Sequence, residues 1–93
     1  MTLQILNTPS DQTEKILREA IEQAIPGAIV EVTTGGAGHF ELRVQAEAFA
    51  GQSRVAQQRL VYGAIAHLMS GETAPVHAID KMETRVPSQE RSD

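Results

Sequence analysis

Histidine is the residue type whose spacing points most directly to chemistry in this chain. The 93-residue sequence has three histidines, at positions 39, 67 and 77, and no cysteine. A neutral imidazole nitrogen is a common metal ligand. Without cysteine the chain has no disulfide, no thiol nucleophile and no thiolate ligand of its own. A thiolate at any metal site must therefore come from a partner.

The three histidines differ in their expected settings. His67 lies near the end of a predicted helix, where a surface histidine interacts favourably with the helix dipole. His39 and His77 each open a predicted strand. Taken alone, a histidine at a strand end is more often hydrogen-bonded to a neighbouring loop than bound to a ligand. Two imidazoles also fall short of the four ligands that zinc takes, so a metal at His39 and His77 would have to be shared.

No other residue pattern indicates catalysis. The sequence has no recognisable Ser/His/Asp set, no phosphate-binding Walker loop and no metal-protease spacing. Its Asp and Glu residues are scattered in the way that is typical of solvated helix faces. The residues therefore give little support to a catalytic pair of carboxylates.

The composition sets further limits. A chain of 93 residues is expected to form one domain with a modest core. The formal net charge of −4 gives no general attraction to nucleic acid. No apolar run reaches the roughly 18 residues of a membrane span, and the first residues lack the regions of a secretory signal. We expect a cytoplasmic protein that does not enter the membrane.

The histidines are positioned by a predicted series of helices and strands. Residues 10–25 have apolar side chains at three- and four-residue spacing, which predicts an amphipathic helix that ends at Pro26-Gly27. Ser10 or Asp11 can cap this helix, with Glu14 as the reciprocal partner of a capping box. Its predicted buried face comprises Ile16, Leu17, Ala20, Ile21, Ala24 and Ile25.

Two strands are expected next. Residues 28–34 are rich in β-branched side chains, and apolar residues alternate with polar ones from Phe40 to Glu47. The glycine-rich stretch 35–38 between them predicts the turn of a hairpin. It also spells a GxxG string, but a KH-type nucleic-acid clamp uses such a loop between helices.

A second helix and a third strand complete the predicted fold. Ser53 can cap a helix that runs to about Met69, and the sequence leaves open whether this helix begins as a separate short helical piece near Arg54. Residues 75–86 predict a strand whose alternation is poor at Asp80, which either a bulge or an edge position would explain. The expected class is α+β, with helices on one face of a three-stranded sheet.

The direction of the third strand decides whether His39 and His77 can act together. A strand–helix–strand crossover is usually parallel, and parallel strands would place both histidines at the same end of the sheet. An antiparallel third strand of about seven residues would separate them by more than about 20 Å. The sequence leaves this choice open.

Several separated motifs resemble the BolA family. They are the strand "FELRVQ", then Phe49-x-Gly51-x-Ser53, then a helix with Val61-Tyr62, and then a strand with His77-Ala78. The resemblance runs from the first helix to the third strand. It implies an α-β-β-α-α-β fold with a three-stranded mixed sheet, related to the class II KH domain. We assign the single domain to residues 10–86, with a lead-in at 1–9 and a disordered polar tail at 87–93.

The resemblance also implies a function. BolA-like proteins are non-enzymatic partners of monothiol glutaredoxins, and the heterodimer binds a bridging 2Fe-2S cluster together with glutathione. The histidine of the His-Ala motif, here His77, is the family's principal ligand, and the hairpin loop supplies the second, here His39. No cluster is expected in the isolated apo chain. Because imidazole must be neutral to bind a metal, cluster sharing should weaken as the pH falls through about 6–6.5.

Two departures from the family pattern stand out. Ala37 occupies the position at which some relatives have a loop cysteine. Val86-Pro87 lies near the place where many relatives have Thr-Pro followed by tryptophan, but it is displaced by one residue and lacks the tryptophan. The alternative function is a KH-like nucleic-acid-binding transcriptional regulator, in which Arg54 and Arg59 would contact phosphate. A homodimer formed through the exposed sheet edge is a third possibility.

Overall fold

The computed structural model describes residues 9–90, and it confirms an α+β fold around one mixed sheet. The predicted lead-in falls almost entirely outside these residues. Within them, no helix is long and apolar enough to cross a membrane. The elements in chain order are α1 (Pro9–Ala24), β1 (Ile29–Thr34), β2 (His39–Gln45), the 3-10 helix η2 (Glu47–Phe49), α2 (Arg54–Ile65), the 3-10 helix η3 (Ala66–Leu68), β3 (Ala78–Arg85) and α3 (Pro87–Glu90).

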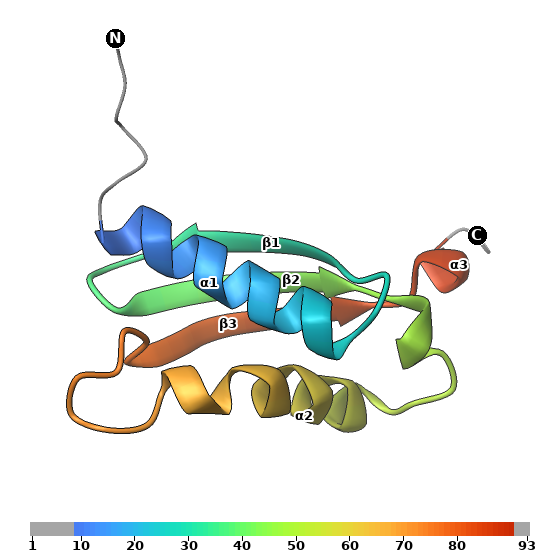
Figure 1. The fold of residues 1–93 in the computed structure, drawn as a ribbon. Helices are drawn as coiled ribbons and strands as arrows, with labels where there is room; N and C mark the ends of the chain where they lie inside the picture. Colours follow the sequence, from blue (N-terminus) through green and yellow to red (C-terminus); the bar gives the residue numbers. More distant parts are fainter. Residues whose placement is uncertain (1–8, 91–93) are drawn as a thin grey trace, which may run out of the picture.

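The sheet has the strand order β1-β2-β3, so β2 is central and β3 lies at an edge. β1 and β2 pair antiparallel as the predicted hairpin. β3 pairs parallel with β2, because the chain crosses back over the sheet through α2 before it enters β3. In Figure 1 the long helix α1 passes over β1 and β2, and α2 lies beside β3.

One face of the sheet is covered by both helices, and the core lies between them. Phe40, Leu42 and Val44 of β2 are almost fully buried on this face, which confirms the alternation read from the sequence. The α2 stripe predicted from spacing is also buried, at Val61, Ile65 and Leu68. The remaining core side chains are Leu17, Ile21, Ile25, Val30, Ala46, Phe49, Val76 and Val86.

Helix α1 has the predicted amphipathic character with its buried face slightly rotated. Proline at the first helical position fits there because the missing N–H has no helical partner in any case. Thr13 is buried, whereas Ile16 remains 43% exposed and Ala24 is exposed. Glu14, for which we predicted a capping role, has a tertiary contact: its carboxylate accepts a hydrogen bond from the Thr34 hydroxyl of β1.

Helix α2 begins where the sequence predicted. The Ser53 hydroxyl accepts a hydrogen bond from the Ala56 N–H at 3.1 Å and caps the helix. The separate helical piece, however, is η2, which lies before Ser53, and the helix from Arg54 is continuous to Ile65. Phe49 explains this placement, since its fully buried side chain anchors η2 against the core.

A buried glutamine joins α2 to its surroundings. The Gln57 amide donates to the Phe49 carbonyl at 3.4 Å and to the Gln52 carbonyl at 3.0 Å, and its oxygen accepts from the Thr84 hydroxyl at 2.6 Å. A buried amide is costly unless its polar atoms have partners. Here the partners connect the start of α2, the preceding loop and β3.

Strand β3 contains both features that its poor alternation suggested. It lies at the sheet edge, and its register with β2 shifts between Phe40 and Glu41, so that Phe40 opposes Ile79 and Glu41 opposes Lys81. Asp80 is the extra residue. Because the bulge resets the alternation, Ile79 and Met82 both pack against the core while Asp80 and Lys81 are exposed.

The end of the described chain differs from the sequence prediction. Residues 87–93 were predicted as a disordered tail, but Pro87–Glu90 form the helix α3. The Glu47 carboxylate accepts hydrogen bonds from the Ser88 N–H at 3.0 Å and from the Ser88 hydroxyl at 2.9 Å. Val86 is buried directly before this helix. Residues 91–93 lie outside the described part of the chain.

Candidate functional site

His39 and His77 lie at the same end of the sheet. His39 is the first residue of β2 and is paired with Ala78, the first residue of β3, so His77 directly precedes the partner of His39. Both strands run away from this end because they are parallel. The sequence left open whether β3 runs parallel or antiparallel to β2. The structure has the parallel arrangement, so His39 and His77 lie at the starts of neighbouring strands.

The imidazole of His77 rests on the backbone of Gly38. A Cβ built on Gly38 would lie 2.8 Å from Cγ, 3.0 Å from Nδ1 and 3.1 Å from Cδ2 of His77. Similar distances to three ring atoms mean that the ring sits over this position. The Gly38 carbonyl accepts the N–H groups of His77, at 2.8 Å, and of Ala78, at 3.1 Å. One side of the ring therefore lies against Gly38, and His77 remains exposed.

The imidazole of His39 contacts a carboxylate. Its Nδ1 lies 3.1 Å from Oδ1 of Asp80, and the two side chains are 45% and 47% exposed. Asp80 reaches His39 because it occupies the bulge, on the strand next to β2. The contact leaves the other ring nitrogen, Nε2, available for a ligand.

The turn between β1 and β2 fixes the backbone of both histidines. The Gly35 N–H donates to the His39 carbonyl at 2.8 Å, and the His39 N–H donates to the Gly36 carbonyl at 2.9 Å. Of the loop glycines, Gly38 alone has a positive φ, at +77°. The GxxG string thus lies in the hairpin, as predicted, and its last glycine contacts the ring of His77. Nucleic-acid binding by Arg54 and Arg59, both exposed, stays a prediction.

His67 lies apart from these two histidines in the sequence and belongs to a different element. It is exposed in η3, as expected for a surface histidine. Among residues 9–90, no three His, Asp or Glu side chains cluster in a way that could hold a metal ion by themselves. A metal at His39 and His77 would need ligands from outside the chain.

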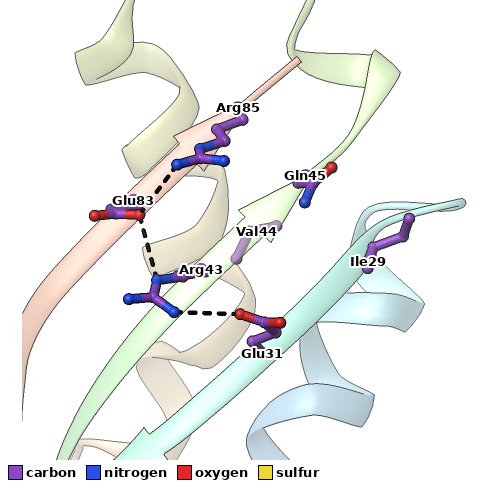
Figure 2. Close-up of a pocket in the computed structure, with 7 residues that line it drawn as sticks. All are labelled: Ile29, Glu31, Arg43, Val44, Gln45, Glu83 and Arg85. Atoms are coloured by element: carbon purple, nitrogen blue, oxygen red, sulfur yellow. Dashed lines mark hydrogen bonds and ion pairs between the residues drawn. The ribbon is translucent and has the colours of Figure 1, made fainter. Parts of the chain in front are cut away.

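The open face of the sheet carries a set of ion pairs. Arg43 lies 3.5 Å from Glu31 and 3.4 Å from Glu83, and Arg85 lies 3.8 Å from Glu83 (Figure 2). Lys81 lies 3.4 Å from Glu83 and, with the two arginines, holds the pKa of that carboxyl below its ordinary value. A hollow on this face is lined by Glu31, Arg43, Glu83 and Arg85, together with Ile29, Val44 and Gln45. It includes neither histidine.

Sequence reasoning missed two residues of the site, Gly38 and Asp80. Gly38 was explained by turn geometry alone, whereas the structure adds the close approach of His77. Asp80 was noticed only as a break in the strand pattern. That break was a usable signal, since bulges often redirect a side chain next to a functional site.

Comparisons with known proteins agree with the fold. The profile of the family described as BolA-like protein matches residues 10–89. No curated protein sequence matches the chain.

Solved structures also resemble the chain. A BolA protein homologue from Coxiella burnetii is 28% identical, with 80% of this chain and 90% of that chain covered and a TM-score of 0.65. BolA1 from Mus musculus is 29% identical, with 84% and 68% covered and a TM-score of 0.65. Yeast Fra2 is 26% identical, with 85% and 84% covered and a TM-score of 0.62.

Proposed function

The chain belongs to the BolA-like family, and from this premise we propose that it is a non-enzymatic partner of a monothiol glutaredoxin. In the proposed heterodimer the two proteins share a bridging 2Fe-2S cluster, with His77 as the principal ligand of this chain and His39 as the second. The role would be in iron–sulfur cluster trafficking or in iron-dependent regulation.

The observation that carries this proposal is the parallel register of β2 and β3. It brings to one end of the sheet two histidines that are 38 positions apart in the sequence. An antiparallel β3 would have placed them at opposite ends, where no shared ligand could join them. The family resemblance named the same two residues from sequence motifs alone.

The side chains at this end of the sheet could supply some, but not all, of the ligands that such a cluster needs. Two imidazoles offer nitrogen ligands, and the sequence contains no cysteine. The described residues also provide no third side chain that could complete a metal site here. A 2Fe-2S cluster accepts thiolate and imidazole ligands together, as in centres where two histidines replace two cysteines. The thiolates would come from the glutaredoxin and its bound glutathione.

The two histidines differ in exposure and in the contacts that their rings make. His77 is exposed, and the ring atoms nearest to Gly38 are Cγ, Nδ1 and Cδ2, so its Nε2 is the ring nitrogen farther from this contact. His39 is oriented by Asp80 and is about half exposed. Both rings can therefore be reached from outside, which a site completed by a second protein requires.

A reconstitution experiment tests the proposal. The purified protein is mixed with a monothiol glutaredoxin, glutathione, ferrous iron and sulfide under anaerobic conditions, and visible absorption and circular dichroism are recorded. We expect a spectrum distinct from that of the glutaredoxin homodimer. His77→Ala should abolish the distinct spectrum, whereas the matched control His67→Ala should retain it. A spectrum unaffected by His77→Ala contradicts the ligand assignment.

A further inference from the structure

The pairing of His39 with Asp80 has a consequence for the ring nitrogens of His39. An ionised carboxylate can only accept hydrogen bonds. The ring nitrogen that faces it, Nδ1 at 3.1 Å from Oδ1, must therefore carry the proton. In a neutral imidazole the other nitrogen, Nε2, then has the free lone pair. Within residues 9–90, no hydrogen bond engages this nitrogen.

We propose that Asp80 is a positioning residue, which holds His39 in the Nδ1–H form and directs Nε2 outward as the nitrogen that binds iron. This inference rests on the proposed function and adds a residue to it. Asp80 itself does not contact the metal in this arrangement. It acts through His39, in the way that a carboxylate commonly orients a metal-binding histidine from the side away from the metal.

The bulge in β3 is the independent observation that supports this role. If β3 continued from Ile79 with regular alternation and no bulge, Lys81 would face the core and Met82 would face outward. The bulge keeps the apolar residues inside and leaves Asp80 exposed beside the first residue of β2. Bulges in parallel strand pairs are rare. Here the irregularity places a carboxylate against one of the two candidate ligands.

The Asp80 carboxylate also lies beside the hairpin loop. The second oxygen of Asp80, Oδ2, lies 3.7 Å from where a Cβ on Gly35 would be. Gly35 in turn donates its N–H to the His39 carbonyl at 2.8 Å. The hairpin loop thus fixes the backbone of His39, and Asp80 fixes the orientation of its ring.

The first measurement uses the apo protein and does not depend on the cluster. Nitrogen-15 correlation spectra of the imidazole, recorded above neutral pH, report which ring nitrogen carries the proton. We expect His39 to be in the Nδ1–H form in the wild type. Asp80→Ala should shift it toward the Nε2–H form that an unconstrained histidine side chain prefers. Asp80→Asn should largely preserve the wild-type form, because the amide oxygen can still accept the hydrogen bond.

The second measurement follows the cluster in the complex with a monothiol glutaredoxin. We expect Asp80→Ala to shorten the lifetime of the cluster by about tenfold, at the lower end of the range for such positioning partners because this pair is about half exposed. Asp80→Asn should recover most of the loss. Glu41→Gln serves as a charge-matched control, since Glu41 lies two residues along β2 on the same face as His39.

The outcomes separate the two proposals. A wild-type His39 in the Nε2–H form overturns the role of Asp80, whatever the cluster does. An Asp80→Ala variant with an altered ring form but an unchanged cluster lifetime also overturns it, as does an equal loss in Glu41→Gln. If the wild-type complex forms no cluster, the proposed function fails and the role of Asp80 in ligation fails with it. The apo spectra then show whether the pairing itself exists.

Discussion

The imidazole of His77 lies against Gly38 so closely that a Cβ on this glycine would come within 2.8 Å of Cγ of the ring. Gly38 also has a φ of +77°, which residues with a side chain rarely adopt. Glycine is therefore favoured at position 38 for two reasons: the backbone is left-handed there, and a side chain would collide with the ring of a candidate ligand. This relationship and three others lead to testable predictions.

Gly38→Ala should both destabilise the protein and displace the ring of His77. The left-handed backbone alone is expected to cost about 1–2 kcal/mol in the free energy of unfolding. Urea unfolding measures this loss, and the proton shifts of the His77 ring report its displacement. Gly36→Ala is the matched control, because a Cβ there has no heavy atom within 4 Å and Gly36 lacks a positive φ. Equal effects in the two variants would contradict the seating of His77.

Gln57→Ala should destabilise the fold by about 1–3 kcal/mol, because it removes the three hydrogen bonds of a buried amide and leaves the Thr84 hydroxyl without this acceptor. Thr84→Val should cost less, since it removes only one of these contacts and keeps the side-chain volume. Chemical unfolding of both variants gives the comparison. As a control, Gln58→Ala changes the neighbouring residue of α2 and should have little effect. A smaller loss for Gln57→Ala than for Thr84→Val would contradict the network.

Glu83→Gln should lower stability at neutral pH, and the difference from the wild type should vanish in acid. Lys81, Arg43 and Arg85 lower the pKa of this carboxyl in the folded protein below 4.5. The contribution to stability is therefore complete above about 4.5 and is lost as the pH falls through the lower folded value. Urea midpoints measured from pH 7 down to about 3 test this sign. A difference that grows in acid would refute it.

Glu47→Ala should loosen α3 from the rest of the fold. The carboxylate accepts two hydrogen bonds from Ser88 in an exposed setting, so we expect a loss of about 1 kcal/mol or less in global stability. Amide hydrogen exchange of residues 88–90 is the sharper measurement, and it should accelerate. Glu72→Ala, in the loop before β3, is a control that should leave this exchange unchanged. Rapid exchange already present in the wild type would favour the disordered tail that the sequence predicted.

Much of the fold could be read from local patterns. The spacing of Leu17, Ile21 and Ile25 predicted the buried side of α1, and alternation from Phe40 to Val44 predicted β2. These patterns are reliable because burial of one face imposes its period on the sequence. The exposure of Ile16 was not predictable, since it depends on how far α1 rotates when it packs.

The sequence by itself determined which residue types were available to the site. Three histidines without cysteine gave the chain nitrogen ligands but no sulfur ligand, which made a thiol-bearing partner necessary for a mixed cluster. The motifs around His77 and His39 also indicated the family. These conclusions depend on chemical identity and on order along the chain, and no folding is needed to reach them.

Only the tertiary structure decided how these residues meet. The parallel direction of β3 put His77 beside His39, the bulge brought Asp80 to the His39 ring, and the bare backbone of Gly38 received His77. Each of these contacts joins segments about 40 positions apart. Strand direction and register are set by the packing of the whole sheet against its helices. In the local sequence, only the break in alternation at Asp80 indicated this arrangement.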